Sequence, residues 1–174
     1  MTMADKTVLV TGARRGIGQA LVQEALARGA ARVYAGTRRP LEHPGERVTP
    51  LILDITSPEQ IWEAVGQVES LDILVNNAGV FVFDDLSDRA ALERHLAVNL
   101  YGTYDVTHAF LPALIRSRGA IVNIGSVAAL APIPLTPAYS VSKAAAFNLA
   151  QSLRILLAGA GGAGALRPQR PSRY

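Results

Sequence analysis

The chain has 174 residues, 49% of them hydrophobic, which is enough apolar material for one substantial core. Its net charge is +3, but Arg167, Arg170 and Arg173 lie in the acid-free last ten positions, so the other 14 basic residues balance the 14 acids and no basic face for nucleic acid is expected. The lack of cysteine excludes disulfides, metal–thiolate sites and cysteine nucleophiles.

Short apolar runs alternate with stretches of helical spacing, which predicts a parallel α/β sheet. Strands are expected near 6–11, 32–37, 48–53, 71–75 and 120–124. Helices are expected near 17–28, 58–69, 88–117 (where a break is allowed) and 137–157. Pro50 suits the third strand only if that strand lies at an edge of the sheet. Gly29 and Gly119 are expected to mark two helix ends.

No apolar run reaches the ~18–20 residues of a membrane span. The first six residues lead straight into the first strand without a signal-peptide pattern, so a cytoplasmic protein is expected. The three histidines, His43, His95 and His108, are scattered and lack metal-ligand spacing. We therefore interpret them as structural or surface groups and predict no metal.

A glycine-rich turn, T-G-A-R-R-G-I-G over residues 11–18, follows the first apolar run and precedes a helical stretch. A strand, a glycine turn and a helix form a dinucleotide-binding unit, because the helix N-terminus points free N–H groups at a pyrophosphate. Gly12 would permit the tight turn, and Gly16 and Gly18 would allow close backbone approach. The spacing is G-x-x-x-G-x-G rather than the commoner G-x-G-x-x-G. Alone, such a triplet is often an ordinary turn.

Tyr139 and Lys143 form a Y-x-x-x-K pair, thirteen residues after Ser126. A phenol has an ordinary pKa of about 10, so it serves acid–base chemistry at neutral pH only where a cation favours the phenolate. On a helix, residues four apart share one face. Ser126 would donate a hydrogen bond to a substrate oxygen. Taken singly, Ser126 could be a strand-end cap and Lys143 a solvated surface charge; the joint spacing favours catalysis.

Together these motifs resemble the short-chain dehydrogenase/reductase family over roughly residues 5–158. The matching segments are Thr11–Gly18, Asp54 after the third strand, Asn76–Gly79 after the fourth, Asn99, and the Ser126, Tyr139 and Lys143 set. The resemblance implies a Rossmann-type doubly wound parallel sheet with strand order 3-2-1-4-5. It also implies an oxidoreductase that transfers a hydride between a nicotinamide cofactor and a carbonyl or alcohol.

The resemblance also assigns roles to single residues. It implies a catalytic tetrad of Asn99, Ser126, Tyr139 and Lys143, in which Asn99 holds a water that links Lys143 to solvent. The cofactor-binding residues it implies are Gly12, Arg14, Arg15, Gly16, Ile17, Gly18, Thr37, Arg38, Asp54, Ile55, Asn77, Ala78, Gly79, Tyr139 and Lys143. Asp54 would contact the adenine.

The end of the second strand indicates which cofactor is used. NAD-binding members of this fold place an acid there to hold the ribose 2′-hydroxyl. Here the position is Thr37, followed by Arg38 and Arg39, and Arg15 stands in the glycine turn. Guanidinium groups pair with a 2′-phosphate that an acid would repel, so NADP is expected. The alternative is that Arg38 and Arg39 are solvated loop charges.

Two further segments suggest partners. The loop 127–137 is rich in Ala, Leu and Pro and would form an apolar wall beside the nicotinamide, which favours a small apolar carbonyl or alcohol substrate. By resemblance, helices near 101–117 and 138–157 would pair two copies of the chain as a homo-oligomer, most simply a dimer. No nucleic-acid or membrane partner is expected.

The C-terminus departs from the family. Family members continue with sixth and seventh strands and a substrate lid, whereas this chain continues with four glycines between 159 and 164 and a Pro/Arg-rich end. We expect residues 1–158 to form the Rossmann domain and Gly159–Tyr174 to be a disordered tail. A frameshift or a naturally short paralogue would each explain the tail. Three classes stay open: a working reductase, a weakly active or inactive cofactor-binding relative, and a non-enzymatic pairing partner.

Overall fold

A computed structural model describes residues 2–42 and 45–159. Five strands form one sheet in the order β3-β2-β1-β4-β5, and all four pairings are parallel. The strands are β1 (Thr7–Thr11), β2 (Arg32–Thr37), β3 (Val48–Ile52), β4 (Ile73–Asn76) and β5 (Ala120–Asn123). The predicted fold class and strand order are confirmed, and each boundary lies within two residues of its expected place.

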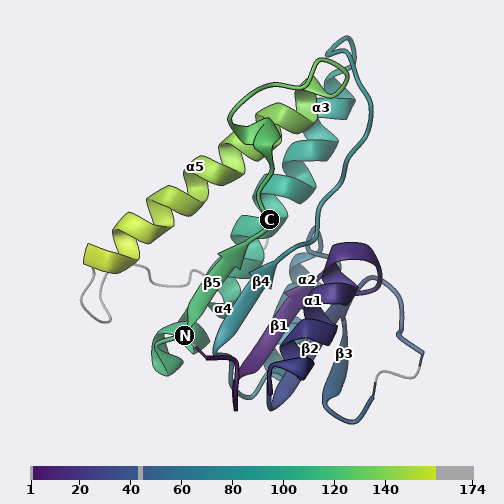
Figure 1. The fold of residues 1–174 in the computed structure, drawn as a ribbon. Helices are drawn as coiled ribbons and strands as arrows, with labels where there is room; N and C mark the ends of the chain where they lie inside the picture. The colour runs from purple at the N-terminus through teal and green to yellow at the C-terminus, as the bar shows by residue number, and fades with distance from the viewer. Residues whose placement is uncertain (1, 43–44, 160–174) are drawn as a thin grey trace.

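Helices cover both faces of the sheet (Figure 1). The α1 helix (Gly16–Ala27) packs on one face through Val22 and Ala25. The α2 helix (Pro58–Gln67) and the α4 helix (Thr103–Ser117) pack on the other, around the fully buried Phe110. The remaining elements are α3 (Arg89–Leu96), the π-helix η1 (Ala97–Gly102), the 3₁₀ turn η2 (Val127–Ala129) and α5 (Pro137–Gly159). The predicted helix near 88–117 is therefore continuous in its path but is interrupted by the π-helical segment η1.

The helices α1 and α4 end next to the two glycines predicted to mark helix ends, but each glycine is needed for a different reason. After α1, Gly29 has a φ of +85°. Its N–H donates to the Leu26 carbonyl and the Ala30 N–H donates to the Ala25 carbonyl, as in a Schellman cap. After α4, the left-handed residue is Arg118 (φ +51°) rather than Gly119. A Cβ on Gly119 would lie 2.3 Å from the Asp72 carbonyl oxygen, so glycine is needed there for space.

The two edges of the sheet differ. The outer strand β3 contains Pro50, opposite Ala35, in agreement with the expectation that this strand lies at an edge. At the opposite edge, β5 has no neighbouring strand on its outer side in the described part of the chain, and Val122 is 43% exposed. A groove of about 990 Å³ opens there between β5, α4 and α5, with Leu114, Ile121 and Phe147 among its walls.

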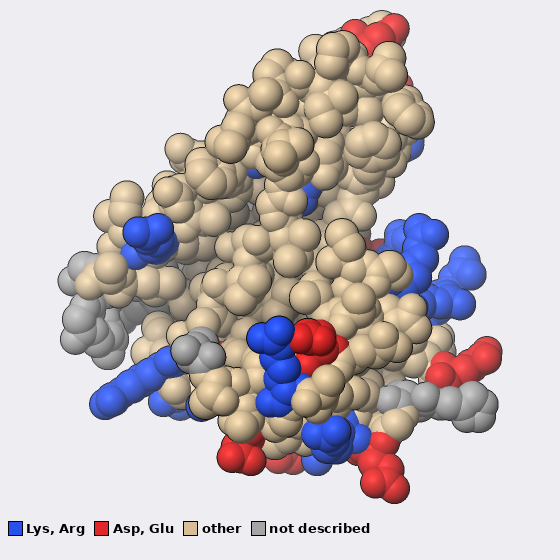
Figure 2. Space-filling model, viewed as in Figure 1, with Lys and Arg blue, Asp and Glu red and all other residues tan. Residues whose placement is uncertain are grey.

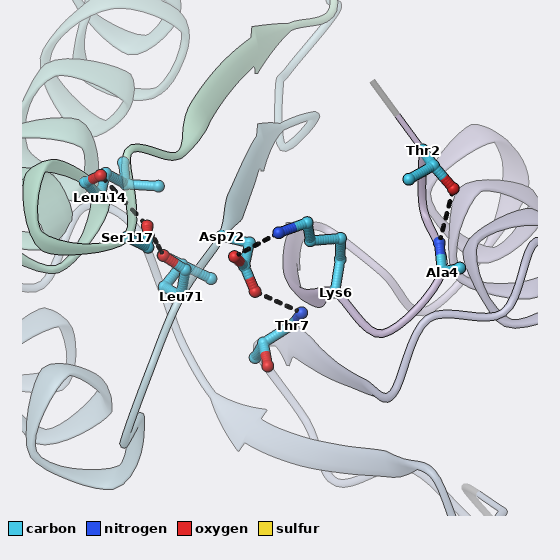
Figure 3. Close-up of polar contacts among 8 residues, drawn as sticks. All are labelled: Thr2, Ala4, Lys6, Thr7, Leu71, Asp72, Leu114 and Ser117. Carbon is cyan, nitrogen blue, oxygen red and sulfur yellow. Dashed lines mark hydrogen bonds and ion pairs between the residues drawn. The ribbon is translucent and has the colours of Figure 1, made fainter.

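Polar contacts fix the N-terminal ends of the central strands β1 and β4 (Figure 3). The Lys6 ammonium bonds Asp72 Oδ1 at 3.1 Å, and the Thr7 N–H donates to Asp72 Oδ2 at 2.9 Å. The Thr7 N–H, aided by Lys6, holds the pKa of Asp72 below its ordinary value. The Ser117 hydroxyl lies within hydrogen-bond distance of the carbonyl oxygens of Leu71 (2.6 Å) and Leu114. These contacts tie β1, β4 and the end of α4 together.

Among the residues with described positions, no helix is both long and apolar enough to cross a membrane. The predicted disordered tail lies outside the described residues except for Gly159, which ends α5. The division into a 1–158 domain and a tail stays a prediction.

Candidate active site

The cofactor positions predicted from the motifs gather at the carboxyl edge of the sheet, because all strands run in the same direction. They follow β1 (Gly12 to Gly18), β2 (Thr37, Arg38), β3 (Asp54, Ile55) and β4 (Asn77, Ala78, Gly79), and Ser126 follows β5. The chain winds outward in both directions from between β1 and β4. Ligands of open α/β sheets bind at such a point of reversal.

The glycine turn has the conformation that a phosphate cradle requires. Gly12 and Gly16 have φ angles of +67° and +57°, and a Cβ on Gly18 would lie 2.2 Å from the Gly12 carbonyl oxygen. Arg15 is the N-cap of α1 and supplies no side-chain cap bond, so within the described chain the first backbone N–H groups of this helix are not capped by that side chain. At Gly16 the left-handed φ favours glycine, and the space that a Cβ would occupy is open. Arg14 and Ile17 are exposed on the same turn.

Thr11 and Asn77 join the ends of β1 and β4. The buried Thr11 Oγ1 accepts hydrogen bonds from the N–H groups of Asn77 and Ala78, both at 3.0 Å. The Asn77 amide donates to the Thr11 carbonyl at 2.9 Å. At Gly79, a Cβ would lie 3.2 Å from Asn99 Oδ1, so this glycine lets the chain pass close to η1.

The ends of β2 and β3 carry the remaining predicted cofactor residues. Thr37 is buried and its hydroxyl donates to the Arg39 carbonyl at 2.6 Å, and the side chains of Arg38 and Arg39 are exposed. Asp54 Oδ1 accepts bonds from the N–H and hydroxyl of Thr56, while Ile55 is buried. Figure 2 shows a group of basic side chains on the right of the molecule, beside the place of the glycine turn in Figure 1.

Tyr139 and Lys143 lie on one face of α5, as their spacing predicts. The Lys143 ammonium lies 5.8 Å from the centre of the Tyr139 ring and donates a 3.0 Å hydrogen bond to the Ile124 carbonyl at the end of β5. Burial lowers the pKa of Lys143. Ser126 follows the same strand, and its Oγ accepts a bond from the Ala128 N–H at 3.2 Å. Among the described side chains, no hydrogen bond joins Ser126 to Tyr139.

Asn99 lies in the π-helix η1 and is 2% exposed. Its Oδ1 accepts from the Val80 N–H at 2.8 Å, and its Nδ2 donates to the Val80 carbonyl and to Ser142 Oγ, at 3.0 and 2.9 Å. The Asn99 side chain therefore ties the loop after β4 to α5. Single π turns inside helices are frequent at functional sites. The water-holding role inferred from the resemblance stays a prediction.

The loop after β4 brings residues to this site that the motifs did not indicate. The Phe81 ring packs edge-on against Tyr139, with centroids 5.0 Å apart, and Phe83 packs against Phe81 at 5.4 Å. His95 is fully buried, and its ring nitrogens bond the Val82 N–H and the Ala91 carbonyl. This agrees with its expected structural role. No short-range motif marks Phe81 in advance, because its contact with Tyr139 joins segments far apart in the sequence.

A family model described as short chain dehydrogenase matches residues 6–161 of this sequence. The chain belongs to the short-chain dehydrogenase family. Members of this family are oxidoreductases. The chain is 38% identical over 158 residues to estradiol 17-beta-dehydrogenase 2 of Mus musculus, covering 81% of this chain and 41% of that protein. It is 35% identical over 166 residues to an NADPH-dependent 1-acyldihydroxyacetone phosphate reductase of Saccharomyces cerevisiae. That match covers 86% of this chain and 55% of the reductase.

A solved relative has the same fold. A short-chain dehydrogenase from Burkholderia cenocepacia J2315, in complex with NADP, superposes with a TM-score of 0.88 at 37% identity. The match covers 91% of this chain and 69% of that protein. The chain thus spans about half the length of the two curated relatives and about two thirds of the solved one.

Proposed function

We propose that this chain carries the cofactor-binding and catalytic residues of an NADP-dependent oxidoreductase that interconverts a carbonyl and an alcohol. The observation that carries the proposal is the meeting of a glycine cradle, exposed arginines and the Tyr139–Lys143 pair at one edge of the sheet. The family of the chain and its NADP-bound structural relative support it.

The residues present fit a dinucleotide with a 2′-phosphate. The open space beside Gly16 and the uncapped start of α1 would take the pyrophosphate. Arg15 and Arg38 would hold the 2′-phosphate, since both are exposed and no acidic side chain follows β2 directly. Asp54, at the end of β3, would lie near the adenine. NADPH, when bound, supplies the hydride.

The other residues would handle the proton and the substrate oxygen. Tyr139 would donate a proton to the carbonyl oxygen during reduction, and Ser126 would donate a hydrogen bond to the same oxygen. Lys143 would favour the phenolate by its charge and would bind the ribose hydroxyls. Asn99 would hold the proton-relay water.

An apolar substrate suits the surroundings of Tyr139. Phe81, Phe83, Val127, Leu130 and Leu135 are all more than half exposed, and the first of them contacts the Tyr139 ring. On the face drawn in Figure 2, the upper lobe, formed by α5, α3 and the nearby loops, is mostly uncharged, with acidic side chains at its tip and a few basic ones. An exposed apolar surface of this kind beside a polar catalytic group is typical of a binding site.

A weakly active cofactor-binding protein is the second candidate. The open edge of β5 and the groove beside it favour this alternative, because Lys143 lines that groove and is thereby reachable by water. Titration of the chain with NADPH, followed by nucleotide fluorescence, tests binding, and oxidation of NADPH at 340 nm with a panel of aryl and alkyl ketones tests turnover. Binding with turnover supports the reductase, and binding without turnover supports the second candidate. Absence of binding contradicts both.

A further inference from the structure

A distant carboxylate caps the helix that carries Tyr139. The Thr136 carbonyl accepts the first helical hydrogen bond, from Ser140, which makes Thr136 the N-cap of α5. An N-cap side chain normally accepts the N–H of the second or third helical residue. Here the N–H of Ala138, the second helical residue, donates instead to Asp84 Oδ1 at 3.1 Å, from 54 positions earlier in the chain. The buried Thr136 Oγ1 has no hydrogen-bond partner within the described chain.

Asp84 also joins the two loops that flank Tyr139. Its N–H donates to the Leu135 carbonyl at 3.2 Å, next to the start of α5. Its Oδ1 accepts a further bond, from the Leu86 N–H at 3.3 Å. Phe81, three residues before Asp84, is the side chain that packs on the Tyr139 ring. The contacts of Asp84 therefore fix both the backbone that bears Tyr139 and the loop that supports its ring.

Burying the Asp84 carboxylate costs free energy, and this cost argues that the residue has a specific role. Asp84 Oδ2 is buried and has no partner among the described residues. Leaving one oxygen of a carboxylate unpaired away from water costs free energy. Two backbone N–H groups and the positive end of the α5 dipole offset that cost. A helix start that needed only a cap could use Thr136, which already occupies the N-cap position.

We propose that Asp84 is a positioning residue for Tyr139. It fixes the first turn of α5 and, through the loop after β4, the face of the Tyr139 ring. As the third residue of α5, Tyr139 lies in the first turn of the helix, next to the Ala138 N–H that Asp84 caps. The effect on turnover rests on the proposed reductase function, whereas the capping of α5 by Asp84 does not.

The experiment compares Asp84→Ala and Asp84→Asn with Asp85→Ala, which removes the neighbouring, exposed carboxylate. Amide hydrogen exchange at Ala138 and Ser140 reports the cap, NADPH titration reports the cofactor site, and kcat with an aryl ketone reports the position of Tyr139. We expect Asp84→Ala to speed exchange at these amides. We expect it to lower kcat about ten- to a hundredfold, the effect of a misplaced reacting group, with the Kd for NADPH unchanged within about twofold.

Asp84→Asn should restore much of kcat and of the protection, because its amide oxygen still accepts the Ala138 bond, roughly half as strongly as a carboxylate. Exchange in Asp84→Ala that matches Asp85→Ala would overturn the proposal, as would loss of NADPH binding in parallel with kcat. If Asp84→Ala does not fold, Asp84→Asn decides: exchange at Ala138 faster than in the parent supports the proposal, and exchange equal to that of both the parent and Asp85→Ala overturns it. If the parent binds NADPH but reduces no ketone, the proposed reductase function is refuted. The exchange data alone then test whether Asp84 caps α5.

Discussion

The Asn99 amide nitrogen donates a 2.9 Å hydrogen bond to the Ser142 hydroxyl, which in turn donates to the Tyr139 carbonyl at 2.7 Å. This chain of contacts leads from the π-helix η1 to the helix that bears the Tyr–Lys pair. Ser142 is fully buried, so both bonds form away from water, where an unmade bond is costly. The Asn99 side chain thus has a structural role, because it links η1 to the helix that bears Tyr139, in addition to the predicted role in proton relay.

Replacement of Arg38 by Ala should weaken NADPH binding selectively. An Arg–phosphate hydrogen bond contributes roughly 1.5–3 kcal/mol, and only NADPH carries the 2′-phosphate. We therefore expect the Kd for NADPH to rise about ten- to a hundredfold, while the Kd for NADH changes little. Arg32→Ala removes the same charge at the opposite end of β2 and serves as the control. Equal weakening of both nucleotides would contradict the assignment of Arg38.

The Tyr139→Phe variant tests acid–base catalysis by the phenol. It removes one hydroxyl and keeps the ring that packs on Phe81, so folding and NADPH binding should survive. Turnover should fall by orders of magnitude, about 10²–10⁴-fold for loss of a general acid. Tyr101→Phe, at an exposed tyrosine on η1, is the matched control. A kcat for Tyr139→Phe within a few-fold of the parent's would refute the mechanism.

The motifs predicted the sheet and its carboxyl edge well because short-range patterns determine them. The apolar runs, the glycines at positive φ and the Tyr139–Lys143 spacing act within a few residues. The contacts of Asp84 and Phe81 with α5 could not be predicted in this way, since they join segments more than fifty residues apart through an irregular loop. Arg118 was missed as the left-handed residue because Gly119, required for space beside Asp72, is the stronger local signal.

Phe83 should contribute to substrate preference. Its side chain is 70% exposed and packs on Phe81, which contacts Tyr139. A buried aromatic contact contributes roughly 1–3 kcal/mol, so Phe83→Ala should raise KM for an aryl ketone about tenfold and leave a small alkyl ketone unaffected. Phe147→Ala changes a partly exposed phenylalanine in the groove along α5 and is the control. A parallel rise in KM for both ketones would exclude Phe83 as a specificity residue.

Asp72 should make the stability of the fold depend on acid pH. Its pKa in the folded chain lies below the ordinary value of 3.8, first because of the Thr7 N–H and then because of Lys6. A lowered pKa means that the carboxylate stabilises the fold above pH ~4 and loses this effect as pH falls through the folded value. Asp72→Asn should therefore cost about 1–2 kcal/mol at pH 7.

Urea unfolding at a series of pH values measures this effect. The difference between Asp72→Asn and the parent should shrink steadily below pH ~4. Glu69→Gln, at a nearby exposed acid, should show little difference at any pH. A cost of Asp72→Asn that stays constant down to the lowest pH would show that this cost does not come from loss of the Asp72 charge.

The open edge of β5 should make the chain self-associate. Val122 is 43% exposed on a strand whose outer side has no neighbouring strand among the described residues, beside an apolar groove of about 990 Å³. Such edges template pairing with other chains, and a lysine on the edge blocks it. On β3, the opposite edge strand, Pro50 already removes one backbone N–H from pairing. Val122→Lys should therefore lower association, whereas Ile52→Lys, at a 42% exposed position on β3, should not.

Sedimentation velocity over a hundredfold range of concentration distinguishes the outcomes. We expect the parent and Ile52→Lys to form larger species as concentration rises, and Val122→Lys to remain monomeric further up the range. If both lysine variants associate like the parent, the exposed faces of η1, α4 and α5 remain as the surface responsible, through Tyr101, Tyr104 and Ile155. Ile155→Lys would then lower association, as expected for the predicted homo-oligomer through these helices. A parent that stays monomeric at every concentration would contradict both surfaces.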